Sequence, residues 1–255
     1  MENPVHFGYW DVALIALVSL QGTIIAYLHA PRWKVLGLAL PIPFTLGSLA
    51  VGEPVGSLHI AGVLLLIAFS FSVLFLHYFV RLPIVLSIAL PAVGYCVAGT
   101  FLANVLPKTD EAFWIVVAVG FAAGLLLHRL VPFRGEPGHR TPLPIWIKLP
   151  AIMLVVASIV SIKQFLHGFL TMFPMVGVIT CYEARKSLWT VCRYIAIIVM
   201  GLAFLMSAVR VSQTWLGIGP ALALGWIVYL SFVVPLFLRK WRHEGCVEDL
   251  IDEQQ

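Results

Sequence analysis

Apolar residues occur in this sequence in long blocks, and polar and charged residues gather in short intervals between the blocks. A helix that crosses the hydrocarbon core of a bilayer, which is about 30 Å thick, needs about 20 mostly apolar residues. By that measure the chain contains nine candidate spans. They cover residues 9–29, 33–51, 57–79, 82–106, 111–131, 144–162, 165–181, 187–209 and 215–238. We expect all nine to be helices, because a backbone exposed to lipid has to satisfy its hydrogen bonds within the segment.

Two of these spans contain prolines that should interrupt a helix. The second span carries Pro41 and Pro43, and the seventh carries Pro174. Proline removes a backbone donor and clashes with the preceding turn, so it kinks or ends a helix. Both spans are also short. The sequence therefore predicts that each of them is a broken or partly re-entrant helix.

The composition agrees with a membrane location. Hydrophobic residues make up 61% of the 255 residues, charged residues make up 11%, and the mean hydropathy is +0.99. A soluble globular domain has about 25% charged residues, so this chain has too little polar surface to coat one. The composition thus excludes a soluble globular protein, a disordered chain and a disulfide scaffold. The predicted fold class is all-α, a polytopic membrane helix bundle.

The net charge of +4 does not indicate nucleic-acid binding, because the lysines and arginines stand singly or in small groups between apolar blocks. The four cysteines form no C-x-x-C pair, and no motif for a metal or another cofactor stands out. The first ten residues lack the basic region and cleavage site of a signal peptide. We therefore expect no cofactor and no nucleic-acid partner, and we expect the first apolar block to remain in the mature protein.

Lysine and arginine collect in the cytoplasmic loops of membrane proteins. With nine spans, the loops on one side contain three of them, namely Lys108, Lys163 and Arg210. The loops on the other side contain eleven, namely Arg32, Lys34, Arg81, Arg129, Arg134, Arg140, Arg185, Lys186, Arg239, Lys240 and Arg242. This partition predicts a multi-pass inner-membrane protein with its N-terminus outside and its C-terminus in the cytoplasm. Residues 243–255 are expected to form an acidic, solvated tail.

The chain resembles itself at an offset of 130 residues. Four residues of each half give the pattern G-x5-E-x3-S-L twice, as Gly47, Glu53, Ser57 and Leu58 and again as Gly177, Glu183, Ser187 and Leu188. The same offset superposes the first three spans on the sixth to eighth, including the two that contain the interrupting prolines. Chance similarity is the alternative, because apolar segments use few residue types.

If the repeat is real, spans one to four and six to nine form two equivalent four-helix units that the fifth span joins. A linker with an odd number of spans turns the second unit upside down, which is the inverted-topology arrangement of many secondary transporters. The predicted organisation is a first repeat in residues 1–110, a linker helix and cytoplasmic loop in 111–143, a second repeat in 144–242, and the tail in 243–255.

A local pattern in the second repeat combines three features. They are the stretch Leu170-Thr-Met-Phe173-Pro174-Met-Val-Gly177, the pair Tyr182-Glu183, and the long apolar span from Ser187. This pattern resembles the small four-helix inner-membrane proteins of the GlpM-like family. The likeness covers about residues 148–241, and residues 10–106 in degenerate form, where Pro41-Ile-Pro43-Phe44 has the reversed order and no Tyr precedes Glu53. The resemblance implies a duplicated four-helix fold and carries over no catalytic residue.

Two carboxylates are the leading candidates for a functional site. Glu53 and Glu183 follow the proline-bearing spans, and a carboxylate near the membrane is costly unless it is paired, protonated or hydrated. The alternative is that each one caps the helix that follows it, where free N–H groups and the helix dipole stabilise an acid.

Four cations form a second set of candidates. Lys148 and Arg193 lie inside predicted spans, and Arg185 and Lys186 lie in the loop between the seventh and eighth spans. Together they could line a recess that binds a phosphate or a carboxylate. The alternative is that each cation reaches out to the phosphates of membrane lipids.

Two functions fit these expectations. The first is a secondary transporter or lipid flippase for a small or lipid-linked anionic substrate, in which the broken spans supply half-helix ends at a midplane site. The second is a non-transporting membrane subunit or assembly factor of a cell-envelope pathway, with lipids and an envelope complex or a second copy as partners. No nucleophile or acid–base set indicates an enzyme. A transporter should bring Glu53, Glu183 and Arg193 to one central cavity, whereas a subunit need not.

Overall fold

The computed structural model of the chain describes residues 8–52, 54–161 and 173–252, with side chains as far as Arg242. In these ranges the protein contains helices and no strands. The helices are α1 (Tyr9–Tyr27), α2 (Pro31–Ala39), α3 (Ile42–Val51), α4 (Ser57–Tyr78), α5 (Ile84–Val105), α6 (Asp110–Leu130), α7 (Ile145–Ser161), α9 (Met175–Glu183), α10 (Leu188–Leu216) and α11 (Ile218–Asp252).

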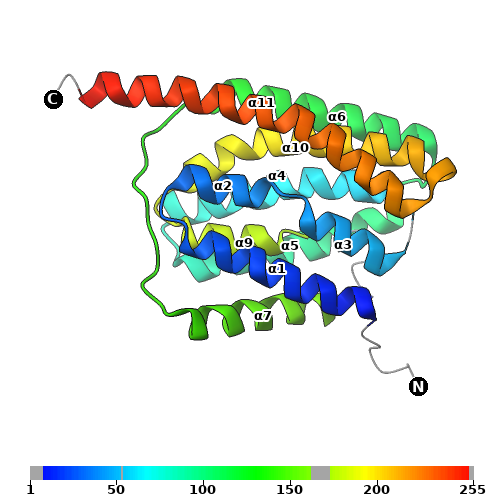
Figure 1. The fold of residues 1–255 in the computed structure, drawn as a ribbon, viewed down its shortest axis with the longest axis horizontal. Coiled ribbons are helices and arrows are strands. Elements are labelled where there is room, and N and C mark those ends of the chain that lie inside the picture. Colours follow the sequence, from blue (N-terminus) through cyan, green and yellow to red (C-terminus); the bar gives the residue numbers. More distant parts are fainter. Residues whose placement is uncertain (1–7, 53, 162–172, 253–255) are drawn as a thin grey trace.

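The helices lie side by side in one bundle, with α10 near its centre (Figure 1). α10 packs against α2, α4, α6 and α11, and it is more deeply buried than the other long helices. The approach of α11 depends on Gly201, because a Cβ atom at this position would lie 2.3 Å from Cγ2 of Val233. A larger residue at position 201 would push the two helices apart.

Seven segments in the described part of the chain are long and apolar enough to cross a membrane. They are α1, α2 together with α3, α4, α5, α6, α10, and α11 as far as Arg242. α7 is apolar but has 17 residues, and most of the seventh predicted span lies outside the described residues. The prediction of an all-helical, multi-pass membrane protein is confirmed, and the count of nine spans stays a prediction.

The second predicted span consists of two short helices, as its prolines indicate. α2 ends at the cap residue Leu40, and α3 begins at Ile42 with Pro41 as its N-terminal cap and Pro43 in its first turn. Proline is tolerated there because the first N–H groups of a helix have no intrahelical acceptor. In the seventh predicted span, Pro174 is the N-terminal cap of α9. The residues before Phe173 in that span are not among those described.

Two helix ends differ from the sequence prediction. α10 continues to Leu216, past the predicted end at residue 209, so Arg210 belongs to a helix and not to a loop. Its last turns stay regular because Arg210 and Gln213 hydrogen-bond with the backbone of Val55. α11 continues as a helix through Asp252, past the predicted end of the last span at residue 238, and the acidic, solvated character of the tail stays a prediction. A helix that already exists extends readily into polar residues, since the costly nucleation step has been made.

Helices that the predicted repeat makes equivalent run in opposite directions (Figure 1). α1 and α7 are antiparallel neighbours, and the same opposition holds for α4 and α10 and for α5 and α11. α6 packs against both α4 and α10, so it contacts both halves of the chain.

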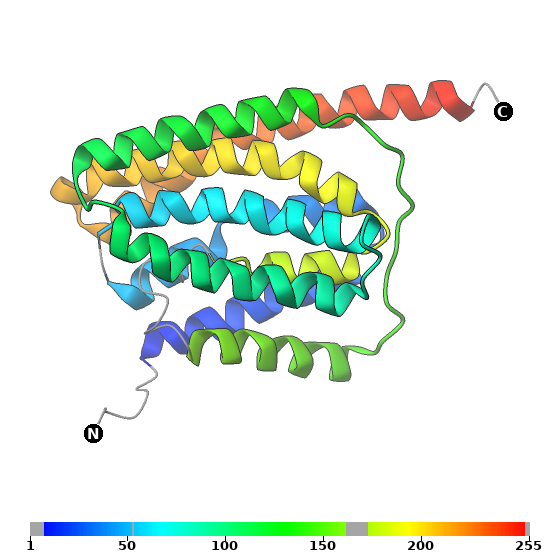
Figure 2. The ribbon, with the colours of Figure 1, turned by 180° about the vertical axis from the view of Figure 1, so that it is seen from behind.

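An extended linker, residues 131–144, crosses one end of the bundle (Figures 1 and 2). We call this end the linker end. α1, α4, α6, α9 and the membrane-crossing part of α11 finish there, and α2, α5, α7 and α10 begin there. Among the lysines and arginines that the structure describes, Lys108 and Arg210 alone lie at the opposite end. The charge asymmetry read from the sequence is therefore an asymmetry between the two ends of the bundle.

Candidate functional site

The break between α2 and α3 is held by side chains from two other helices. Nε2 of Gln21, in α1, donates to the carbonyl oxygens of Gly37 (2.8 Å) and Leu40 (3.2 Å). The hydroxyl of Tyr229, in α11, donates to the carbonyl oxygen of Ala39. Gly37 and Ala39 are in the last turn of α2, and Leu40 is its cap. The N–H of Leu40 also donates to the carbonyl oxygen of Gly37 (3.4 Å), and the two side chains supply further donors at an end where a helix lacks them. The broken helix is therefore a built feature, because its exposed backbone groups are satisfied inside an apolar bundle.

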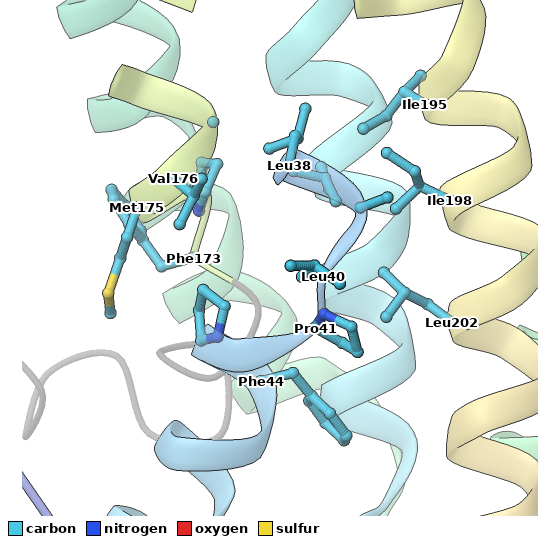
Figure 3. Close-up of a pocket in the computed structure, with 15 residues that line it drawn as sticks. Leu38, Leu40, Pro41, Phe44, Phe173, Met175, Val176, Ile195, Ile198 and Leu202 are labelled. Atoms are coloured by element: carbon cyan, nitrogen blue, oxygen red, sulfur yellow. The ribbon is translucent and has the colours of Figure 1, made fainter. Parts of the chain in front are cut away.

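The two proline positions meet inside the bundle. A cavity of about 70 Å³ lies between the end of α2, the start of α3 and the start of α9, with α4 and α10 behind it. Figure 3 shows Leu40, Pro41 and Phe44 on one side, Phe173, Met175 and Val176 on another, and Ile195, Ile198 and Leu202 on α10. We call it the break cavity. Helix ends at this depth present backbone groups that a continuous helix would bond internally, and at the end of α2 the side chains of Gln21 and Tyr229 satisfy them.

A charged cluster lies at the linker end of the bundle. Nζ of Lys148 is 3.1 Å from Oε1 of Glu183, and both side chains are almost fully buried. Lys148 also donates to the carbonyl oxygen of Ala26 (3.0 Å), and Oε2 of Glu183 accepts from the N–H of Thr141 (3.1 Å). The ring of Tyr27 lies 4.8 Å from the Lys148 ammonium. Each ion is thus paired, which a buried charge requires.

Lys34 belongs to the same cluster and is fully buried. Its Nζ donates to the carbonyl oxygen of Glu183 (2.6 Å) and to that of His139 in the linker. Arg185 joins through its hydrogen bond to the hydroxyl of Thr141 (3.2 Å). We call Lys34, Lys148, Glu183 and Arg185 the charged cluster. Three cations and one carboxylate leave it with a net positive charge, in surroundings where burial strengthens electrostatic interactions.

The linker carries a histidine beside this cluster. Partial burial lowers the pKa of His139 below its ordinary value of 6.5, and the positive charges of Arg185, Lys186 and Lys34 lower it further, while Glu183 acts in the opposite direction. The ring is therefore less easily protonated than a free histidine. This direction agrees with a positive potential at the linker end.

A groove extends from the charged cluster toward the other end of the bundle. It has a volume of about 500 Å³ and lies between α5, α7 and α9. Lys148 and Glu183 line its linker end, and nearly all the rest of its lining is apolar. Lining residues on α7 run from Ile147 to Ile159, which is about 18 Å along a helix. The rim is exposed at Val85 and Ile147, so the groove opens sideways between α5 and α7.

One residue borders both spaces. Phe173 lines the groove and the break cavity, and its ring contacts Tyr95 edge-on with the centroids 5.3 Å apart. It is 5% exposed. The groove and the break cavity are therefore separated at one aromatic side chain.

The predicted site residues divide into three groups. Lys148, Glu183 and Arg185 come together in the charged cluster, whereas Lys186 is exposed beside it. Arg193 lies elsewhere, with its guanidinium 5.0 Å from the ring centroid of Phe133 and its carbonyl accepting from Lys240. It lines neither the groove nor the break cavity. Glu53 lies outside the described residues. The expected shared lining of one central cavity by Glu183 and Arg193 is not observed.

Two alternatives considered for these residues are wrong. Lys148 is 4% exposed and bonds inward, so it does not reach out toward lipid phosphates. Glu183 ends α9 and faces Lys148 and the linker, and the carboxylate that caps α10 comes from Glu136. Glu183 does not cap α10 because the path of the linker places Glu136 over the first N–H groups of that helix.

Sequence reasoning missed Lys34 and Glu136. The charge partition counts Lys34 as a loop residue, although it falls at the start of the second predicted span. An ionisable residue inside a predicted span indicates a functional or paired charge, and this signal could have identified Lys34. Glu136 stands in the linker with no local pattern around it. Its role depends on packing between segments far apart in the sequence.

The described residues contain no group of three or more His, Cys, Asp or Glu side chains that could hold a metal ion. Comparison of the chain with protein-family models, curated proteins and solved structures found no match. The resemblance to the GlpM-like family therefore stays a prediction.

Proposed function

We propose that the protein is a membrane transporter of the flippase type, which moves an anionic lipid or a lipid-linked anion between the two leaflets. The observation that carries the proposal is the groove between α5, α7 and α9, because it joins a positively charged cluster to a long apolar trough that opens sideways. A lipid has the same two parts, a charged head group and apolar chains. The head group would lie at the charged cluster and a chain in the groove.

Charge favours an anionic head group. Glu183 neutralises one of the three cations of the cluster, and the exposed side chains of Lys186 and Arg140 add positive charge nearby. Arginine and lysine bind phosphate and carboxylate groups through charge-assisted hydrogen bonds. A zwitterionic or neutral head group would leave part of the positive charge without compensation, at a depth where that is costly.

The break between α2 and α3 and the start of α9 opposite it support movement and not only binding. In inverted-repeat transporters, broken helices meet near the midplane, and one repeat rocks against the other about that point. Here the break between α2 and α3 faces the start of α9 across the break cavity, and equivalent helices run in opposite directions. We take the two halves to be inverted repeats with α6 between them. Phe173 would then be the barrier that has to move for a head group to pass.

The distribution of cations supports the orientation expected from the sequence. The linker end would face the cytoplasm and the start of α1 would face outward, because cytoplasmic ends carry the excess of Lys and Arg. The groove then opens at the cytoplasmic leaflet, where the head group of a lipid made inside the cell is available.

The test is a flipping assay on purified protein in liposomes. Fluorescent phosphatidylglycerol and fluorescent phosphatidylcholine are incorporated in separate liposome preparations, and the fraction protected from an added quencher is followed in time. We expect the protein to accelerate loss of protection for phosphatidylglycerol more than for phosphatidylcholine. Lys148→Gln should slow that movement about tenfold or more, as loss of a charge-assisted contact in the transition state does.

Arg239→Gln is the matched control, because it removes an exposed cation at the same end from α11, which is not part of the groove. Wild-type protein that moves neither lipid faster than empty liposomes would contradict the proposal for these substrates. Equal rates of lipid movement in Lys148→Gln and Arg239→Gln would show that the groove is not part of the transport path.

A second function is favoured by one observation. Lys34 and Lys148 donate to backbone carbonyls of the linker, α9 and α1, so the cluster fastens these segments together. A membrane subunit or assembly factor of an envelope pathway would need this fastening and no movement. The flipping assay separates the two, because a subunit would bind anionic lipid at the groove without accelerating its transfer.

A further inference from the structure

A polar pocket at the opposite end of the bundle is independent of the groove. It has a volume of about 240 Å³ and lies at the start of α4, beside the turn that leads into α6. Its lining includes Ser57, His59, Lys108, Thr109 and Arg210. Lys108 and Arg210 are the two cations that the structure describes at this end, and both contribute to this pocket.

The start of α4 offers backbone donors to the pocket. The first N–H groups of a helix have no intrahelical acceptor and carry the positive end of the helix dipole. The side chain of His59 folds back so that its Nδ1 accepts from the N–H of Gly56 (3.2 Å). Because Nδ1 is the acceptor, the neutral ring carries its proton on Nε2. This Nε2 is buried without a hydrogen-bond partner, and the side chain is 2% exposed, so the ring holds an unused donor.

The start of α10 can be compared with the start of α4, because a side chain occupies the space in front of its first N–H groups. Both helices begin beside an end of α6, where Ser57 donates to the carbonyl oxygen of Pro107 (2.8 Å) and Trp189 donates from Nε1 to that of Pro132 (2.9 Å). At α10, the carboxylate of Glu136 accepts from the N–H of Thr190 (2.6 Å) and from its hydroxyl (2.7 Å). At α4, the described residues supply no carboxylate to the helix start, and the pocket lies beside that start.

Charge in the pocket is partly compensated. Nε of Arg210 donates to Oδ1 of Asp110 (3.1 Å), and its Nη1 donates to the carbonyl oxygen of Val55 (2.9 Å). Asp110 is largely exposed and does not line the pocket. Lys108 is exposed and has no counterion among the described residues. Among the residues that the structure describes around the pocket, the charge balance is positive.

From these observations we infer that the pocket at the start of α4 binds a phosphate or carboxylate group, in the way that Glu136 occupies the start of α10. Lys108 supplies the charge, the first amides of α4 and the Thr109 hydroxyl supply hydrogen bonds, and His59 positions the turn. The group can belong to a free anion or to the head group of a lipid in the leaflet at this end.

The test measures binding to the purified full chain in detergent by titration calorimetry, with two probes in separate arms. The probes are inorganic phosphate and dihexanoyl phosphatidic acid, a soluble short-chain lipid. We expect saturable binding of at least one probe, and Lys108→Gln should weaken it about tenfold. Arg129→Gln is the matched control, because it removes one exposed cation from the other end of α6, and it should leave the affinity unchanged.

His59→Phe keeps an aromatic ring of similar shape but removes both ring nitrogens, and we expect it to weaken binding as well. If this buried substitution prevents folding, Lys108→Gln still decides the question, since its side chain is exposed. Binding of inorganic phosphate would show a free-anion site, and binding of the lipid alone would show a head-group site. Absence of saturable binding to the wild type would overturn the inference. So would binding that survives Lys108→Gln and disappears in Lys148→Gln, because the anion would then lie at the linker end.

Discussion

Lys148 on α7 and Glu183 on α9 form a buried ion pair beside the linker. Nζ of Lys148 lies 3.1 Å from Oε1 of Glu183. Both side chains are almost fully buried, so each charge depends on the other and on backbone groups. Lys148 reaches the carbonyl of Ala26, and Glu183 reaches the N–H of Thr141. The pair therefore ties α1, α7, α9 and the linker together at one point.

The first prediction concerns the stability that this pair provides. Lys148→Met should lower the free energy of unfolding by about 3–5 kcal/mol, because it leaves the Glu183 carboxylate buried without its cation. The double variant Lys148→Met with Glu183→Met should be more stable than the sum of the single effects predicts. Thermal unfolding in detergent measures both. Asp110→Asn, which breaks an exposed pair, should cost about 1 kcal/mol or less. Equal losses of stability in Lys148→Met and Asp110→Asn would contradict the prediction.

The second prediction concerns the groove. Ala89 on α5 and Ala151 on α7 line it and are exposed, so Ala89→Trp and Ala151→Trp should fill the groove without crowding the core. We expect slower movement of anionic lipid in liposomes with an unchanged unfolding temperature. Ala118→Trp, on the exposed face of α6, should change neither quantity. Wild-type rates in both groove variants would show that the lipid takes another path.

The third prediction concerns the broken helix. Gln21→Leu removes the donor that serves the carbonyls of Gly37 and Leu40, and it should destabilise the protein by about 1–3 kcal/mol because these buried acceptors lose a partner. Ser158→Ala is the control, since that hydroxyl bonds only within α7 on an exposed face, and it should be neutral within about 0.5 kcal/mol. If the two variants unfold at the same temperature, the break does not depend on Gln21.

The fourth prediction concerns pH. The pKa of His139 is lowered in the folded protein, so the unfolded chain binds a proton more readily than the folded one. Stability should therefore fall as the pH drops below about 6.5, the value of an unperturbed histidine. His139→Gln should show a smaller loss of unfolding temperature between about pH 7.5 and about pH 5.5. A loss equal to that of the wild type would assign the pH dependence to other groups.

The fifth prediction concerns orientation. Reporter fusions after Lys108 and after Arg140 should report opposite sides of the membrane, with position 140 in the cytoplasm, because the two positions lie at opposite ends of α6. If both fusions report the same side of the membrane, α6 does not span the membrane. The second half of the chain would then not be inverted relative to the first.

Much of the helical layout was predictable because a lipid environment permits few structures. Long apolar blocks have to be helices there, and the proline positions gave the break at Pro41 and the start of α9 after Pro174. Those signals are local, as the geometry of proline acts on its own turn. The ends of α10 and α11 were less predictable. Arg210 and Gln213 extend α10 through contacts with Val55, which precedes α4 and is distant in the sequence.

The candidate site was predictable in its residue types and not in its arrangement. Glu183 and Lys148 stood out in the sequence because charges are costly in a membrane segment. Their pairing, the burial of Lys34 and the separation of Arg193 from them follow from how α2, α7 and α9 pack and from the path of the linker. Likewise Glu136 is one carboxylate among several in the sequence, and only the fold brings it to the start of α10. The sequence by itself determined that this protein is a helical membrane bundle with a broken second span and a positive end. The tertiary structure alone decided which charges are paired and where the groove opens, because both depend on contacts between segments that the sequence keeps far apart.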